Sequence, residues 1–279
     1  MKSKMVTKHN FQLYLALIIL FIIIFSSIFA PVLATHNPFE PDIINRMQGP
    51  SAEHFLGTDA LGRDIYSRIL FGGRAAILLS LAAAVLSLGM GLIAGIVCGF
   101  FGGKIDLFIT SISNVFQGIP GSCFMIAIAG VFGPSATSLI IALVITSWAG
   151  FSRIVRAEVI QIKKEPFVEG LYCIGCSNLR IILLHILPNI LSKLLVLFTI
   201  RIGRGILSVA GLSFLGLGVQ PPTPDWSVMI NDAVLYYRSA PHLIIMPGLC
   251  IFLLIYSINI LGDALRDKFD VRFGEAKKW

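Results

Sequence analysis

Residues 76–101 read AILLSLAAAVLSLGMGLIAGIVCGFF and contain no charged side chain. About 20 consecutive apolar residues are enough for a helix to cross the hydrocarbon core of a bilayer, so this stretch predicts a transmembrane helix. Within it, Gly91, Gly95 and Gly99 recur every four residues and share one face of the helix. Small residues on one face let a second helix approach closely. The stretch therefore predicts a membrane helix that packs inside a bundle.

Similar apolar stretches recur along the chain, whose 279 residues are 56% hydrophobic and only 13% charged. Such a composition does not suit a soluble domain, and backbone groups in lipid must be paired within helices. We therefore expect an all-α, polytopic membrane protein with about six transmembrane helices. The expected spans are residues 12–32, 76–101, 106–132, 136–157, 189–215 and 242–263, with Pro120 and Pro247 placed to kink the third and the last.

The placement of the charges argues against nucleic-acid binding, and the length of the first apolar run argues against a cleaved signal peptide. The net charge is +7, but the basic residues lie in short loops beside apolar runs and form no face interleaved with aromatic residues. The first run, from Phe11 to Leu33, is far longer than the apolar region of a secretory signal peptide. It is expected to remain as the first span.

Lysine and arginine are distributed unequally between the two expected sides of the membrane. With the N-terminus inside, fifteen of these residues fall in cytoplasmic segments and five in outer segments. The five outer ones are Arg46, Arg63, Arg68, Arg74 and Arg238. Because cytoplasmic loops of membrane proteins carry the excess of Lys and Arg, both termini are expected to face the cytoplasm.

This topology divides the chain into four parts. They are the N-terminal tail with the first span (1–33), a long outer loop (34–75), a five-helix core (76–263) and a cytoplasmic tail (264–279). In the outer loop, Asp59 is expected to cap a short amphipathic helix that lies on the membrane surface. Leu61, Ile65 and Ile69 would form its apolar face.

Motifs of enzyme chemistry are missing from the sequence. Lys104 follows two glycines but precedes Ile105, so the Ser or Thr of a Walker A phosphate-binding loop is absent. Cys173 and Cys176 have CxxC spacing, but no second pair completes a zinc site. The histidines are scattered, and His36, His54 and His242 are expected to be surface or interfacial residues. We expect no catalytic residue, no cofactor and no metal site.

The basic loop at residues 158–189 carries the signals of a short helix, expected at 166–174. Pro166 suits a first helical turn, because its missing N–H has no intrahelical partner there. Glu169 follows within that turn, where a negative charge favours the positive end of the helix. Gly175 is placed to stop the helix, and Ser177 to cap the next one.

The same loop resembles a known motif. Glu169, Gly175 and Ile186-Leu187-Pro188 resemble the EAA loop in permease subunits of binding-protein-dependent ABC importers. The chain departs from the pattern at Gly170 and Leu171, where alanine is usual. The resemblance makes this segment an ATPase-coupling loop, whose candidate residues are Glu169, Gly175, His185, Leu187 and Pro188.

Four further stretches resemble the C-type permeases of dipeptide, oligopeptide and nickel importers, and the likeness runs from about His54 to Asp270. The stretches are LGTDALGRD (56–64), LSFLGLGV (212–219), PPTPDW (221–226) and LGDALRD (261–267). The resemblance implies a type I ABC importer permease fold in a bacterial cytoplasmic membrane. It also implies three kinds of partner: a second permease, two cytoplasmic ATPase subunits that hydrolyse ATP, and an outer binding protein. An ATP-independent channel is the competing class.

The substrate is expected to be nickel or another metal or metal chelate, because two stretches look more like nickel-type permeases. These are Val209-Ala210-Gly211 and residues 228–232, VMIND. Import of di- or oligopeptides is the alternative. The permease speaks weakly on this choice, because the binding protein does most of the selecting in such systems.

Arg201 and Arg204 stand three residues apart on one face of the fifth expected span. A buried arginine is costly in lipid, so two interpretations remain open. Both side chains can reach back to the inner membrane surface, or both can line the translocation path. In the second case they would attract an anionic substrate, because the planar guanidinium meets a carboxylate through two parallel hydrogen bonds.

Overall fold

The structure of the chain, a computed structural model, describes residues 2–269, with side chains from residue 11 to residue 268. Every regular element in this range is helical, which confirms the all-α class. The long helices are α1 (Lys2–Ile28), α3 (Ile65–Phe101), α4 (Gly103–Gly118), α5 (Gly121–Phe132), α6 (Ala136–Lys163), α9 (Leu187–Phe214) and α11 (His242–Phe269). The short elements are α2 (Ala30–Leu33), η1 (Ile43–Asn45), α7 (Pro166–Cys173), α8 (Asn178–Ile181), the π-helix η2 (Ile182–Ile186), α10 (Trp226–Ala233) and η3 (Val234–Tyr236). The expected C-terminal tail lies outside the described residues from residue 270 onward.

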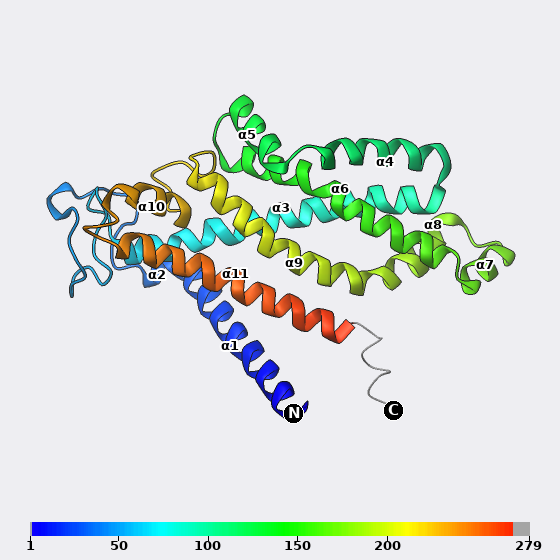
Figure 1. Ribbon diagram of the computed structural model, residues 1–279, viewed down its shortest axis with the longest axis horizontal. Helices are drawn as coiled ribbons and strands as arrows, with labels where there is room; N and C mark the ends of the chain where they lie inside the picture. Colours follow the sequence, from blue (N-terminus) through cyan, green and yellow to red (C-terminus); the bar gives the residue numbers. More distant parts are fainter. Residues whose placement is uncertain (1, 270–279) are drawn as a thin grey trace.

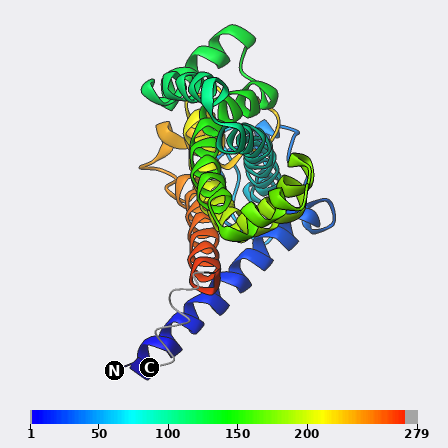
Figure 2. The same cartoon turned by 90° about the vertical axis from the view of Figure 1, so that its right-hand side faces the viewer.

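Four helices, α3, α6, α9 and α11, form the body of the molecule and run along its length (Figures 1 and 2). The short helices α7 and α8 lie at one end of this body, and α10 lies at the other, beside the segment between α2 and α3 (Figure 1). Helix α1 packs on α11 and α3 and diverges toward the N-terminus. The long helices therefore join two ends, and, after the topology expected from the sequence, we call the end with α10 the outer end and the end with α7 and α8 the inner end.

The tightest contact in the body joins α3 to α6 along the glycine face that the sequence indicated. A Cβ atom at Gly95 would stand only 2.6 Å from the Cβ of Val155, and one at Gly99 only 2.8 Å from the Cβ of Val159. Gly91 meets Phe151 in the same way. Any larger side chain would separate the helices, so the expected close packing is confirmed.

The third expected span is broken rather than kinked. Helices α4 and α5 meet at an angle of 87°, with Pro120 as the residue before α5. Proline disfavours a helical conformation at the preceding residue, and Ile119 is extended, with φ −99° and ψ 131°. Within residues 2–269, five helices are long and apolar enough to cross a membrane, and the count becomes six when the bent pair is taken as one span. Pro247, by contrast, lies inside α11 without interrupting it.

The prediction of a separate amphipathic helix before the second span was wrong. Asp64, and not Asp59, caps the helix, and its carboxylate accepts the N–H of Ser67 at 2.8 Å. Helix α3 then runs without a break from Ile65 to Phe101. Gly62, at φ +76°, sets the boundary, because a Cβ there would collide with the backbone of Asp42. Ile65 and Ile69 therefore belong to the transmembrane helix, and Leu61 lies in the turn before it.

Candidate functional site

At the inner end, α7 is the short helix that the sequence predicted, one residue shorter than expected. Pro166 occupies its first turn and Glu169 lies exposed in that turn. Gly175 follows the helix at φ +77°, where its N–H bonds to the carbonyl of Tyr172, and the N–H of Cys176 bonds to that of Leu171. These two bonds form a Schellman motif, which needs a left-handed residue at the position of Gly175. Ser177 precedes α8, but its side chain donates or accepts no capping bond.

The other three candidate residues lie on the chain that leads into α9. Pro188 has no N–H to give to the carbonyl four residues earlier, and the backbone widens into the π-helix η2 just before it. There the N–H of Leu187 bonds to the carbonyl of Ile182. The side chain of Asn189 donates to the carbonyl of His185 at 2.6 Å. Helices α8, η2 and α9 thus follow one another directly, so the C-terminal part of the expected loop is a continuous helical segment.

A buried apolar core lies beneath this segment. Val168 of α7, Ile181 of α8 and Ile186 of η2 are fully buried. They belong to one cluster with Val155 and Val159 of α6, which are also fully buried. Burying one such aliphatic side chain, rather than leaving it exposed to water, stabilises the folded chain by about 1.5–3 kcal/mol. The short helices are therefore fixed to α6 and α9, and they do not form a loose loop.

The outward side of the same segment exposes large apolar side chains. Ile174 is 76% exposed and Leu179 is 66% exposed, and Phe167 and Tyr172 are also exposed. Large apolar side chains exposed on neighbouring short helices can form a site where another protein binds. Glu169 and Gly175 sit at the start and just past the end of α7 within this surface, whereas Leu187 is half-buried beneath it.

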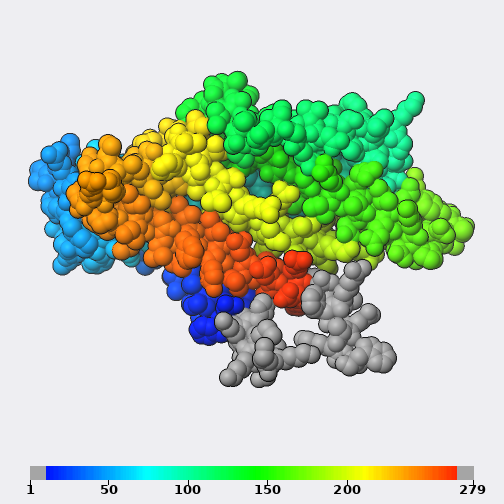
Figure 3. Space-filling model, viewed as in Figure 1, coloured from blue at the N-terminus to red at the C-terminus, as the bar shows by residue number. Residues whose placement is uncertain are grey.

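Midway along the body, Arg201 and Arg204 open into a cavity of about 170 Å³ between α3, α6 and α9. We call it the path cavity, after the translocation path that is one of the two interpretations of these arginines from the sequence. Figure 3 shows a hollow between α6 and α9 on this face of the molecule. Serine hydroxyls contribute to its wall, and no acidic side chain does. Its lining is Ser80, Ala83, Ala84, Ser87, Leu143, Ser147, Phe151, Arg201, Arg204, Gly205 and Ser208.

The guanidinium of Arg201 is held by packing rather than by a counter-charge. It lies over the ring of Phe151, 5.1 Å from the ring centre. Gly150 leaves room for it, because a Cβ there would stand 2.5 Å from one guanidinium nitrogen. Among the described side chains, no carboxylate forms an ion pair with Arg201 or Arg204. The cavity thus holds two positive charges that the described chain leaves without an anion.

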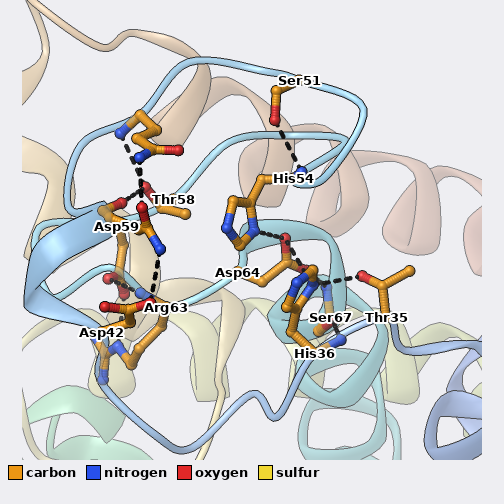
Figure 4. Close-up of polar contacts among 12 residues, drawn as sticks. Thr35, His36, Asp42, Ser51, His54, Thr58, Asp59, Arg63, Asp64 and Ser67 are labelled. Carbon is orange, nitrogen blue, oxygen red and sulfur yellow. Dashed lines mark hydrogen bonds and ion pairs between the residues drawn. The ribbon is translucent and has the colours of Figure 1, made fainter.

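The outer end contains a buried polar network that sequence reasoning missed. Asp59 accepts the N–H groups of Leu61 and Arg63 and pairs with the Arg63 guanidinium at 2.6 Å. Arg63 reaches on to Asp232 of α10 at 3.4 Å, and the fully buried Arg68 donates to the carbonyl of Pro38 (Figure 4 shows part of this network). Burial raises the pKa of the Asp232 carboxyl, although the charge of Arg63 opposes the shift. The LGTDALGRD stretch therefore fastens the outer loop to α3 and α10.

The two glycines of the LGTDALGRD stretch could have indicated from the sequence that this stretch forms a turn. Gly57 and Gly62, at φ +78° and +76°, turn the chain on either side of Thr58 and Asp59. Two glycines so close to Asp, Arg and Asp are typical of a constrained turn rather than of a helix. A cavity of about 420 Å³ opens between this turn and α10, and its wall includes Asp59, Arg63 and Asp232.

Comparison of the sequence with known protein families identifies the family of this chain. Residues 91–274 match the family described as "Binding-protein-dependent transport system inner membrane component". The chain belongs to this family. Its members are membrane permease subunits of ABC importers, so this permease is a multi-pass transport protein, not an enzyme, and ATPase activity lies in separate subunits.

Relatives of this permease include two kinds of importer subunit. The chain is 39% identical over 263 residues to the dipeptide transport system permease protein DppC of Alkalihalophilus pseudofirmus, which covers 94% of this chain and 86% of the relative. It is 40% identical over 258 residues to the glutathione transport system permease protein GsiD of Escherichia coli, covering 91% of this chain and 84% of that protein. These relatives agree with the C-type permease resemblance, but they do not confirm the expected preference for nickel.

Solved structures share the fold of this permease. An inward-facing MetNI methionine ABC transporter matches 72% of this chain and 96% of its own with a TM-score of 0.60 and 15% identity. An amino acid ABC transporter matches 69% of this chain and 92% of its own with a TM-score of 0.51 and 19% identity. The type I ABC importer permease fold expected from the sequence is therefore confirmed.

Proposed function

We propose that this permease forms half of the membrane pathway of an ATP-driven importer of short peptides. The observation that carries the proposal is the pair of arginines in the path cavity, which face no acidic lining residue. Dipeptides and glutathione, the substrates in the names of the relatives, carry free carboxylates. A cationic cavity suits such substrates and disfavours a bare metal cation. Nickel import requires a carboxylate-rich chelate to fit the same cavity.

Transport in this proposal requires a second permease, two cytoplasmic ATPase subunits and an outer binding protein. The exposed apolar surface around α7 supports ATPase docking at the inner end, with Glu169 and Gly175 shaping that surface. His185, Leu187 and Pro188 carry the movement into α9, because η2 leads directly into that helix. ATP-driven closure of the ATPases would then rock the spans between inward-open and outward-open states.

The substrate class is tested by uptake in a strain that lacks the gene for this chain. Cells with and without the restored gene are given labelled dipeptide, labelled glutathione or radioactive nickel, and ATP-depleted cells serve as the control. We expect the restored gene to recover energy-dependent uptake of dipeptide or glutathione but not of nickel. Recovery of nickel uptake alone would reverse the choice of substrate, and uptake that survives ATP depletion would favour a channel.

The orientation of the permease is proposed to be N- and C-termini inside, as the unequal distribution of Lys and Arg indicates. Gly49 and Ser177 are both exposed and lie at opposite ends of the molecule, so each suits a single cysteine. The five native cysteines, Cys98, Cys123, Cys173, Cys176 and Cys250, are first replaced by serine or alanine. We expect an impermeant thiol reagent to label Gly49→Cys in intact cells and Ser177→Cys only after permeabilisation. The reverse pattern would invert the topology.

A further inference from the structure

Three side chains that are far apart in the sequence meet at the outer end, just above the start of α3. His36 follows α2, His54 lies in the irregular segment before the LGTDALGRD turn, and Asp64 is the cap of α3. Each offers one donor atom, and these atoms lie within 4.8 Å of one another. Figure 4 shows both imidazole rings beside the carboxylate of Asp64. We call His36, His54 and Asp64 the outer histidine cluster.

The carboxylate of Asp64 divides its two oxygens between two tasks. Its Oδ2 accepts the N–H of Ser67 at the start of α3. Its Oδ1 faces the imidazoles, 3.0 Å from Nδ1 of His54 and 3.9 Å from Nδ1 of His36. The longer distance exceeds that of a hydrogen bond. His36 instead lies 3.0 Å from the hydroxyl of Thr35, so its ring is held beside the carboxylate without bonding to it.

These distances suit a metal ion among the three atoms. Zinc bonds imidazole nitrogen and carboxylate oxygen at about 2.0–2.2 Å, which places neighbouring ligand atoms roughly 3.3 Å apart in a tetrahedron. The observed separations of 3.0 and 3.9 Å bracket that value. The ring of His36 is the partly exposed member, so its rotation would be the adjustment needed to bring the longer separation nearer to that value. Two imidazoles and one carboxylate also form the donor set that first-row transition metals prefer, whereas magnesium and calcium favour oxygen ligands alone.

Burial assigns a role to each member. The side chain of Asp64 is fully buried and that of His54 is 6% exposed, whereas that of His36 is 35% exposed. The buried pair therefore forms a fixed base, and His36 forms the side through which an ion can enter from the outer solution. Three protein ligands with one open position differ from a closed structural zinc site, which has four.

We propose that the outer histidine cluster binds one divalent transition-metal ion, with Zn²⁺ as the best-fitting occupant. The bound ion would tie the segment after α2 and the segment around His54 to the first turn of α3. None of the three residues lines the path cavity, so the site is separate from the proposed peptide pathway. The structure brings His36 and His54 together, whereas the sequence predicted scattered surface or interfacial histidines. The proposal does not depend on the identity of the transported substrate.

The test uses the full chain purified in detergent with an affinity tag that contains no histidine. After treatment with a chelator, the protein is titrated with Co²⁺, whose visible absorption reports tetrahedral coordination, and the Co²⁺ is then displaced with Zn²⁺. We expect one tetrahedral Co²⁺ per chain and its loss on addition of Zn²⁺. His36→Ala and Asp64→Asn should each weaken binding about 10-fold or more. Asparagine keeps an oxygen that can cap α3, so this variant removes charge without removing the cap.

A matched control removes a histidine of similar burial at the inner end. His185→Ala should bind Co²⁺ as the wild type does, and thermal unfolding without metal should show that all three variants are folded. Zn²⁺ should also raise the Tm of the wild type and of His185→Ala, but not that of His36→Ala. Absence of stoichiometric Co²⁺ or Zn²⁺ in the wild type would overturn the proposal, leaving the cluster as hydrogen-bonded histidines. Equal binding by His36→Ala and Asp64→Asn would overturn it as well.

Discussion

Gly175→Val is expected to lower uptake at least about tenfold while the permease stays in the membrane at wild-type abundance. Gly175 stands at φ +77°, where a β-branched residue is strained. A left-handed conformation costs an ordinary residue roughly 1–2 kcal/mol, and about 1.4 kcal/mol corresponds to tenfold in docking affinity. Relief of this strain would unwind the end of α7 and reorient its exposed apolar surface. Uptake, membrane abundance and co-purification of the ATPase subunits measure the effect.

Two glycine variants separate conformation from crowding. A Cβ at Gly175 meets no atom within 4 Å, so the expected loss comes from the backbone and not from a collision. Gly175→Asn should therefore keep most of the uptake, because asparagine tolerates the left-handed region. Gly170→Ala adds a methyl group to α7 where nothing lies within 4 Å, and it should be harmless. Glu169→Lys should impair uptake through the docking surface, because it places positive charge at the positive end of α7. Wild-type uptake by Gly175→Val would show that this segment does not couple to the ATPases.

The double variant Arg201→Gln with Arg204→Gln is expected to insert normally and to lose nearly all peptide uptake. Removing two charges from a span lowers the cost of insertion. The same change removes charge-assisted hydrogen bonds to a carboxylate, each worth about 1.5–3 kcal/mol. ATPase activity stimulated by the binding protein should persist, because the inner end is unchanged. The double variant is compared with wild type by membrane abundance, uptake and ATPase rate.

A lysine pair at the same positions distinguishes charge from shape. Arg201→Lys with Arg204→Lys keeps both charges but loses the planar fork and the stacking of Arg201 on Phe151. If the pair binds a carboxylate, this variant should transport more than the glutamine pair and less than wild type. If the side chains only reach the inner surface, lysine should serve as well as arginine. Normal uptake by the glutamine pair would exclude these arginines from the pathway.

The sequence predicted the features that depend on local composition. Long apolar runs are unambiguous, and Pro166 and Gly175 marked both ends of α7 because each acts through its own backbone conformation. The start of α3 was different, since Asp59 and Asp64 are both suitable caps. The choice depends on the backbone of Asp42 lying against Gly62, and this contact exists only in the folded chain.

The polar clusters of the outer end could not be predicted from the sequence either, because their contacts also exist only in the folded chain. His36, His54 and Asp64 are joined through irregular segments, which carry no periodicity from which a shared face can be read. The sequence placed a kink at Pro120, but it could not predict the angle of 87° or the contact of α5 with α6, which exists only in the folded chain. The expected roles of Glu169, Gly175, His185, Leu187, Pro188, Arg201 and Arg204 stay predictions until the variants are measured.

One side of α6 contacts both the buried core at the inner end and the wall of the path cavity. Val159 and Val155 share the buried cluster that holds α7, and both also press against the glycine face of α3. About one turn from Val155 on the same side, Phe151 meets Gly91, and the guanidinium of Arg201 lies over its ring. Close-packed interiors transmit displacement instead of absorbing it. If ATPase docking tilts α7, we therefore expect α6 to carry that displacement to Phe151 and to the guanidinium of Arg201 that lies over its ring.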